Sequence, residues 1–131
     1  MLDILVTILI VIAIFILIGV MRYVRTQRYL KTLTEPQFIE GYRKAQLIDV
    51  REPNEFERGH ILGARNIPMS QLKTRLLEVR KDQPVYLYCQ SGQRSLRAAT
   101  ILKKNGYQDL NHLKGGFRKW TGKVKVKKKA Y

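Results

Sequence analysis

Cysteine is nearly absent from this chain: Cys89 is the only one in 131 residues. An intramolecular disulfide is therefore excluded, and no second thiol of the same molecule could resolve an oxidised or sulfur-loaded Cys89. Histidine is almost as scarce. His60 and His112 are the remaining candidate zinc ligands, and no two of these three residues lie at zinc-ligand spacing, so no metal is expected.

Acidic residues are also few, 10 against 25 Lys and Arg, and the imbalance is uneven. Residues 1–34 hold four basic residues and one acid, residues 35–113 hold thirteen and nine, and residues 114–131 hold eight and none. Basic ends of this kind bind anionic lipid or nucleic acid. A run of charge is more often simply solvated. With a predicted membrane anchor on the same chain and no nucleic-acid motif, anionic lipid is the possible partner and no nucleic acid is expected.

Charge is missing altogether from residues 4–21, which are nearly all Ile, Leu and Val. As a helix they would extend about 27 Å, close to the hydrocarbon thickness of a bilayer. A buried core helix and a cleaved signal peptide are the alternatives, but a signal peptide has a basic flank and a small-x-small site, which this segment lacks. Basic residues follow the segment directly (Arg22, Arg25, Arg28 and Lys31). We therefore expect a single-pass anchor in the cell membrane with the N-terminus outside and the domain in the cytoplasm.

Short helices and strands are expected to alternate through the rest of the chain. Thr34 with Gln37 reads as a capping box for a helix to about residue 42, and Asn54 and Ser70 read as N-caps of helices ending near residues 58 and 80. A further helix is expected over 95–104 and a short one within 113–120. Strands or short extended pieces are expected over 47–50, 65–68, 84–88 and 107–113. Such alternation predicts an α/β fold with a central parallel sheet flanked by helices.

The loop after the 84–88 strand carries the candidate chemistry. Cys89 lies where ligands bind in parallel sheets, at the carboxyl end of a strand. A thiol is a strong nucleophile only as its thiolate, which a helix N-terminus and a guanidinium such as that of Arg94 both stabilise. Loop amides cradle anions, and Gly92 permits a close approach of backbone to ligand. A lone cysteine after an apolar strand is otherwise a small buried hydrophobic residue.

The loop pattern Cys-x-x-Gly-x-Arg-Ser resembles the active-site loop of the rhodanese-like sulfurtransferases. The resemblance covers roughly residues 34–122 and extends to three further motifs, LIDVREPNEF at 47–56, GHILGARNIP at 59–68 and LKGGF at 113–117 with Trp120. It predicts a single rhodanese-like domain over 32–122, preceded by the anchor and its basic flank over 1–31 and followed by a basic tail over 123–131.

The resemblance implies sulfur transfer by covalent catalysis without a cofactor. Cys89 would take sulfur from thiosulfate or a similar anionic donor as a persulfide, and a thiol or cyanide would accept it. The loop amides would stabilise the sulfur while Arg94 orients the donor. The substrate-binding loop is expected to comprise Gln90, Ser91, Gly92, Gln93, Arg94 and Ser95. Structural support near the site is expected from Asp49, from His60 as a packing histidine, and from Gly115 and Gly116.

Two other functions compete with this one. Cysteine phosphatases use a similar loop with one more residue between cysteine and arginine, and the shorter loop here favours sulfur over a tetrahedral phosphate. A membrane-tethered persulfide carrier or protein-binding module with little free turnover is the second alternative. The retained cysteine favours chemistry over a purely structural module.

Overall fold

Five parallel strands form the central sheet of the domain, in the order β1–β6–β5–β2–β4. The computed structural model describes residues 1–126, and residues 127–131 of the predicted tail lie outside the described residues. The strands are β1 Leu30–Leu33, β2 Gln46–Asp49, β4 Arg65–Asn66, β5 Val85–Tyr88 and β6 Leu110–Leu113. β2 and β6 are buried at every position, as expected for a sheet covered on both faces. The predicted α/β architecture is confirmed.

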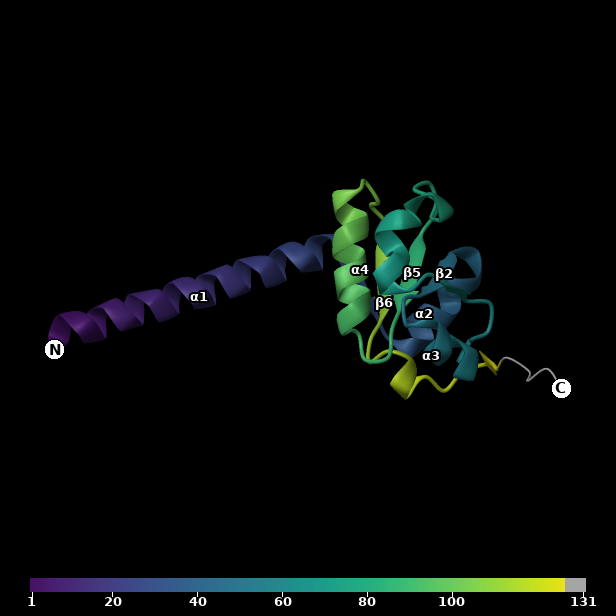
Figure 1. The fold of residues 1–131 in the computed structure, drawn as a ribbon, viewed down its shortest axis with the longest axis horizontal. Coiled ribbons are helices and arrows are strands. Elements are labelled where there is room, and N and C mark those ends of the chain that lie inside the picture. Colours follow the sequence, from purple (N-terminus) through teal and green to yellow (C-terminus); the bar gives the residue numbers. More distant parts are fainter. Residues whose placement is uncertain (127–131) are drawn as a thin grey trace.

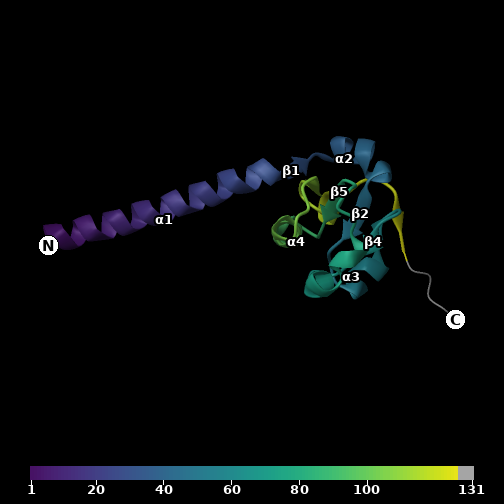
Figure 2. The same ribbon diagram turned by 90° about the horizontal axis from the view of Figure 1, so that it is seen from above.

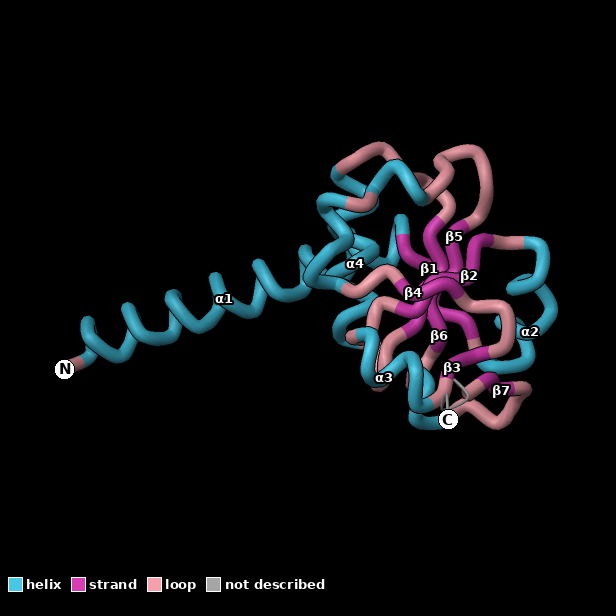
Figure 3. The backbone as a smooth tube through the Cα atoms, turned by 45° about the vertical axis from the view of Figure 1, so that its right-hand side comes forward, coloured by secondary structure: helices cyan, strands magenta, loops and turns pink. Residues whose placement is uncertain are grey.

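Helices cover the two faces of this sheet (Figures 2 and 3). The helix α4 (Gln93–Lys104) packs on one face, and α2 (Glu35–Gly41) packs on the other. Successive strand residues point to opposite faces, so Ile48 and Leu87 join the α4 side while Leu47 and Tyr88 join the α2 side. Within the domain, the remaining helical segments are α3 Pro53–Arg58 and four short 3-10 turns at Tyr42–Lys44, Met69–Thr74, Leu76–Glu78 and Phe117–Lys119.

The predicted caps have different outcomes. The capping box of Thr34 and Gln37 is confirmed, with the Thr34 amide donating to Gln37 Oε1 at 3.0 Å. Asn54 as the N-cap of α3 is wrong, because Glu52 occupies that position and its amide bonds to Glu55 Oε1. Pro53 explains the shift: proline favours the first position of a helix, which places the cap one residue earlier.

The helix expected over 70–80 is also wrong, because this stretch forms two separate 3-10 turns. Ser70 does not cap it; its hydroxyl donates to Glu52 Oε1 at 3.1 Å. The amide of Met69 bonds to the carbonyl of Val50, which fixes the start of the stretch to the end of β2. Three residues of the predicted apolar stripe, Leu72, Leu76 and Val79, still pack on the core, whereas Leu77 is fully exposed.

A long N-terminal helix, α1 (Leu2–Tyr29), projects away from the domain (Figure 1). Residues 2–26 are long and apolar enough to cross a membrane, and none of their most apolar stretch is buried. The helix continues into β1 without a linker, and the Tyr29 hydroxyl lies 3.3 Å from Thr100 Oγ1 on α4. Sequence analysis missed β1, whose Leu30 is buried and pairs with Leu110 of β6.

A second, two-stranded sheet was also missed. β3 (His60–Ile61) pairs antiparallel with β7 (Val124–Lys125), which lies inside the segment predicted as a tail. Two valines among lysines offer too little apolar surface to predict a strand, and the pairing comes from a partner more than sixty residues away. This pairing ties the chain beyond Trp120 back to the domain.

Candidate active site

Cys89 follows β5 directly and is completely buried. Its Sγ accepts hydrogen bonds from the backbone N–H groups of Gly92 at 3.0 Å and Ser95 at 3.3 Å. The sulfur therefore lies at the N-terminus of α4, which begins at Gln93, two residues before the predicted start. Unpaired amides and the helix dipole stabilise negative charge at this position.

Gly92 gives the loop its inward turn. Its φ of 114° lies in the left-handed region that favours glycine. A Cβ at this position would meet no atom within 4 Å, so the requirement is for backbone conformation rather than for space. Ser91 and Gln93, on either side, are exposed. The loop thus directs amides inward at the sulfur and side chains outward.

The Arg94 guanidinium forms an ion pair with the Glu55 carboxylate. Its Nη1 and Nη2 donate to Glu55 Oε1 and Oε2 at 2.6 and 3.0 Å, in a half-exposed bidentate pair. The Arg94 bonds lower the pKa of Glu55 to about 2, and the same pairing raises the pKa of Arg94. The predicted role of Arg94 in orienting a donor stays a prediction, and a bound anion would compete with Glu55 for the guanidinium.

Asp49, predicted to support the site, forms a buried ion pair with Arg51, a residue that sequence analysis did not single out. Arg51 is 3% exposed and Asp49 is fully buried; the guanidinium donates to both carboxylate oxygens, with the shortest bond at 2.7 Å. Arg51 also donates to the Gly59 carbonyl and to Gln90 Oε1, and lies over the Phe117 ring at 4.3 Å. It therefore links the end of β2 to the loop. The available signal was the spacing of an acid and a base two residues apart, after a buried strand.

His60 packs against Phe56 of α3. Its ring stacks on Phe56 with centroids 3.6 Å apart, and its Nδ1–H donates to the Phe56 carbonyl at 2.8 Å. The carbonyl can only accept, so this bond fixes the tautomer. The surroundings of His60 are those of a packing residue.

The Gly115–Gly116 turn lies directly against the loop. A Cβ on Gly116 would come within 2.5 Å of the carbonyl oxygens of Cys89 and Gln90. The two residues after this glycine use the close approach, because the Phe117 and Arg118 amides donate to these same carbonyls at 2.8 and 3.1 Å. The contact fixes the outer side of the loop.

A chain of hydroxyl and imidazole groups leads away from the sulfur, and sequence analysis missed it. Ser95 Oγ lies 3.6 Å from Cys89 Sγ and 3.0 Å from His112 Nδ1, and His112 Nε2 lies 2.9 Å from Thr32 Oγ1. The Ser95 hydroxyl donates to the Gly92 carbonyl, so Nδ1 donates to Ser95 and Nε2 accepts from Thr32. Burial lowers the pKa of His112, consistent with a neutral ring. Thr32 and His112 become neighbours only through the pairing of β1 with β6.

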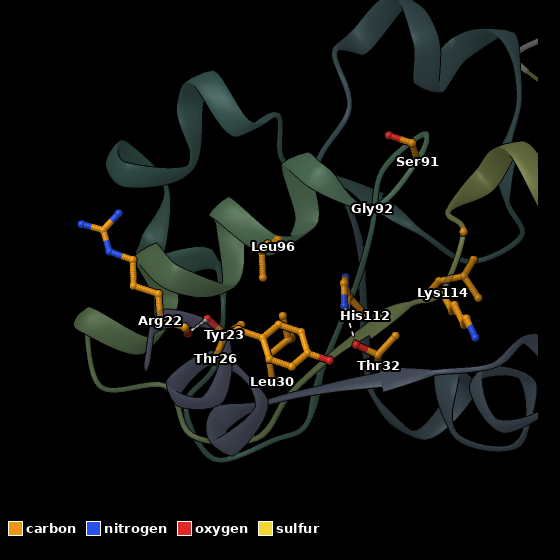
Figure 4. Close-up of a pocket in the computed structure, with 12 residues that line it drawn as sticks. Arg22, Tyr23, Thr26, Leu30, Thr32, Ser91, Gly92, Leu96, His112 and Lys114 are labelled. Atoms are coloured by element: carbon orange, nitrogen blue, oxygen red, sulfur yellow. Dashed lines mark hydrogen bonds between the residues drawn. The ribbon is translucent and has the colours of Figure 1, made fainter. Parts of the chain in front are cut away.

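A pocket of about 480 Å³ opens beside the loop (Figure 4). Ser91 and Gly92 line it from the loop, Leu96 from α4 and His112 from β6. Its remaining wall includes Tyr23 and two neighbours on α1, so the N-terminal helix is part of the site. Within residues 1–126 no group of three or more His, Cys, Asp or Glu side chains could hold a metal ion.

Comparison with known proteins gives a consistent result. The sequence profile described as "Rhodanese-like domain" matches residues 31–123. An uncharacterised Bacillus subtilis protein, YqhL, is 70% identical over 99 residues, covering 76% of this chain and 79% of that protein. A putative sulfur carrier protein of the same organism, YrkF, is 35% identical, covering 67% of this chain and 48% of that protein.

Two further matches concern activity and fold. A sulfurtransferase from Allochromatium vinosum is 39% identical over 75 residues, covering 57% of this chain and 70% of that protein. The crystal structure of a rhodanese-related protein from Thermoplasma volcanium superposes with a TM-score of 0.69 at 26% identity, covering 74% of this chain and 99% of that one.

Proposed function

Because this chain belongs to the rhodanese-like domain family, we propose that it transfers sulfane sulfur through a persulfide on Cys89. Sulfurtransferase relatives support this type of activity at the level of the family. The donor we propose is thiosulfate or a similar sulfur-bearing anion, and the acceptor is a thiol or cyanide. The placement of Cys89 Sγ against two inward-pointing amides of the α4 N-terminus is the observation that carries the proposal.

The proposed reaction has two displacement steps. The Cys89 thiolate attacks the outer sulfur of thiosulfate, the S–S bond of the donor breaks, and its electron pair leaves with sulfite. The enzyme is left as a Cys89 persulfide. An acceptor thiolate or cyanide then attacks the terminal sulfur, the persulfide bond breaks, and its electron pair returns to Cys89 Sγ. No net oxidation or reduction of the enzyme occurs, so no cofactor is needed.

The loop stabilises each anionic state in turn. The Gly92 and Ser95 amides already contact Sγ, so a thiolate forms without reorganisation of the loop. The complete burial of Cys89 keeps bulk water from the sulfur, which strengthens these interactions. Arg94 orients the donor's sulfonate in this scheme by sharing its guanidinium between the sulfonate and Glu55.

Thiocyanate formation from thiosulfate and cyanide tests the proposal. The full chain, purified in detergent, is assayed beside Cys89→Ser, with an aryl phosphate as a parallel substrate. We expect thiocyanate from the wild type alone and no phosphate release. A folded wild-type protein that forms no thiocyanate, or that forms it equally well without the thiol, would refute the thiosulfate reaction. Phosphate release would instead support the phosphatase alternative.

A persulfide carrier with little free turnover is the second candidate. The full burial of Cys89 favours it, since a buried persulfide is protected from solvent and delivered only where a partner opens the loop. The relative described as a putative sulfur carrier points the same way. Mass spectrometry of the isolated protein separates the two functions: a stable additional sulfur on Cys89 without turnover supports the carrier.

We further propose that α1 anchors the domain to the cell membrane, with the N-terminus outside and the domain in the cytoplasm. The apolar helix supports the span, and basic residues at 22, 25 and 28 support the orientation and contact with anionic lipid. Protease digestion of spheroplasts and of inverted vesicles tests the topology. Cleavage of the domain in spheroplasts would contradict it.

A further inference from the structure

The pocket beside the loop combines the catalytic domain with the segment of α1 that leaves the apolar span (Figure 4). We propose that it binds the sulfur acceptor, and that this acceptor is an amphiphile from the membrane, with a thiol and an anionic group on an apolar chain. This inference rests on the sulfur transfer proposed above and adds to it the class of acceptor and its place of binding.

The walls of the pocket suit an apolar chain. Tyr23 on α1 is 66% exposed and Leu96 on α4 is 39% exposed, and both line the opening. Leu30 and Leu113 contribute apolar surface deeper in the wall. Figure 4 shows Tyr23 and Leu96 projecting from different helices around the same opening, with His112 beside them. Exposed apolar side chains that line one concave opening are typical of a ligand site.

The position of the pocket on α1 points to the membrane as the source of the ligand. Tyr23 and Thr26 lie at the last turns of the apolar span, where a crossing helix emerges from the hydrocarbon. A smaller hollow of about 190 Å³ follows the same helix toward the span. It shares Arg22 with the first pocket and adds Ile18, Met21 and Arg25, so a basic and apolar surface continues along α1 from the pocket toward the span.

The charges around the pocket favour an anion. Lys114 lines it and no acidic residue does, and the N-terminus of α4 begins beside Gly92 on the same wall. Arg22 contributes to the rim, although its guanidinium points outward (Figure 4). Neither Lys114 nor Arg22 forms an ion pair within the part of the chain that the structure describes.

The pocket is also close to the reacting sulfur. Gly92 lines the pocket and its amide contacts Cys89 Sγ at 3.0 Å, so one loop residue separates the two spaces. A bound acceptor thiol loses its proton to solvent, and its thiolate attacks the terminal sulfur of the Cys89 persulfide. The S–S bond breaks, its electron pair returns to Sγ, and the acceptor leaves as its own persulfide.

A chain-length series of acceptors tests the inference with the full chain in dodecyl maltoside micelles. The probes are 2-mercaptoethanesulfonate and 8-mercaptooctanesulfonate, and the readout is sulfite release from thiosulfate. Burial of six more methylenes in the pocket is expected to raise kcat/KM by at least about tenfold for the longer thiol. Equal values for the two thiols would overturn the inference.

Partition into micelles could itself favour the longer thiol, so matched variants are required. Leu96→Asn alters the pocket, and Leu62→Asn alters a leucine of the same 39% exposure that does not line this pocket. We expect the ratio of the two kcat/KM values to fall several-fold in Leu96→Asn and to stay at the wild-type value in Leu62→Asn. An unchanged ratio in a folded Leu96→Asn protein would show that the preference arises from the micelle.

A second variant covers the anionic group and the case in which Leu96→Asn fails to fold. Lys114→Gln is compared with Lys73→Gln, an exposed lysine outside the pocket, using 8-mercaptooctanesulfonate and the uncharged 8-mercaptooctanol. The preference for the sulfonate should fall about threefold or more in Lys114→Gln only. Equal preference in all three proteins would refute an anionic acceptor.

Binding separates failure of this inference from failure of the proposed function. Persulfide formation on Cys89 by thiosulfate alone, read by mass spectrometry, tests the function without any acceptor. Octane-1-sulfonate, titrated calorimetrically against the full chain and Leu96→Asn, tests the pocket without any chemistry. Wild-type binding that weakens in the variant supports the site even if no persulfide forms, and absence of wild-type binding overturns it even if a persulfide does.

Discussion

A methyl group added to Gly116 should displace the catalytic loop, whereas one added to the neighbouring Gly115 should not. A Cβ on Gly116 would lie 2.5 Å from the carbonyl oxygens of Cys89 and Gln90. Non-bonded carbon and oxygen atoms in contact lie about 3.4 Å apart, so the loop would have to move by about 1 Å. A Cβ on Gly115 would instead meet the Cδ atom of Lys119 at 2.9 Å, and that flexible side chain can turn away.

Both substitutions carry a backbone cost, because both glycines have a positive φ and Gly116 also has a ψ of −168°, a region almost restricted to glycine. The φ values are 67° at Gly116 and 78° at Gly115, where a side chain costs about 1–3 kcal/mol. Gly116→Ala adds about 1–3 kcal/mol of overpacking against backbone atoms. We therefore expect a loss of about 2–6 kcal/mol in the free energy of unfolding for Gly116→Ala and about 1–3 kcal/mol for Gly115→Ala.

Activity should separate the two variants more sharply than stability. A misplacement of about 1 Å at a reacting group costs about a hundredfold in rate. Thiocyanate formation, normalised to the folded fraction from circular dichroism, should therefore fall about a hundredfold in Gly116→Ala and only a few-fold in Gly115→Ala. Equal activities in the two variants would show that the loop adapts, and the argument that this turn positions Cys89 would fail.

Three further predictions concern stability. Asp49→Ala leaves the buried Arg51 guanidinium unpaired and should lower the free energy of unfolding by about 3–5 kcal/mol. Asp82→Ala breaks an exposed ion pair and should change it little. Similar effects of the two substitutions in urea unfolding would contradict a stabilising role of the buried pair. Burial lowers the pKa of His112, so this residue contributes to the free energy of unfolding above the pKa of the unfolded state, and the contribution is lost as pH falls through the folded pKa. The difference in the free energy of unfolding between wild type and His112→Gln should therefore narrow from pH 7 to 5. A difference that stays constant over this range would contradict the prediction. A chain of residues 22–131 should fold, whereas a chain of residues 34–131 lacks β1 and its buried Leu30 and should lose at least about 2 kcal/mol in the free energy of unfolding. Equal melting temperatures of the two chains would contradict a stabilising role of β1.

Local sequence signals predicted several of the elements that local interactions specify, although they wrongly predicted one helix where two 3-10 turns form after Pro68. The capping box at Thr34, the apolar strand before Cys89 and the helix after it all depend on residues a few positions apart, and all are present. The two-stranded sheet and β1 depend on partners far away in the chain, so no local pattern marks them. β1 was further hidden because an apolar helix runs into it without a break.

The candidate site divides in the same way. The loop residues from Cys89 to Ser95 were candidates from the sequence because their spacing is itself the motif, and their role stays a prediction. Arg51 and His112 reach the site through tertiary contacts, one through a buried pair with Asp49 and the other through the pairing of β6 with β1. Sequence pattern also suggested an open guanidinium at Arg94, and only the fold reveals the acid that occupies it.

The direct passage of α1 into β1 has a mechanical consequence. A flexible linker would let a domain rotate freely above a bilayer. Here α1 continues directly into the edge strand β1, and the Tyr29 hydroxyl is hydrogen-bonded to Thr100 on α4. Where residues 2–26 cross a bilayer, the tilt of the helix adjusts to bilayer thickness. A change in tilt would rotate the domain with the helix and change the distance and orientation of the Cys89 loop relative to the lipid surface. Bilayer thickness would then alter the access of sulfur donors and acceptors to Cys89.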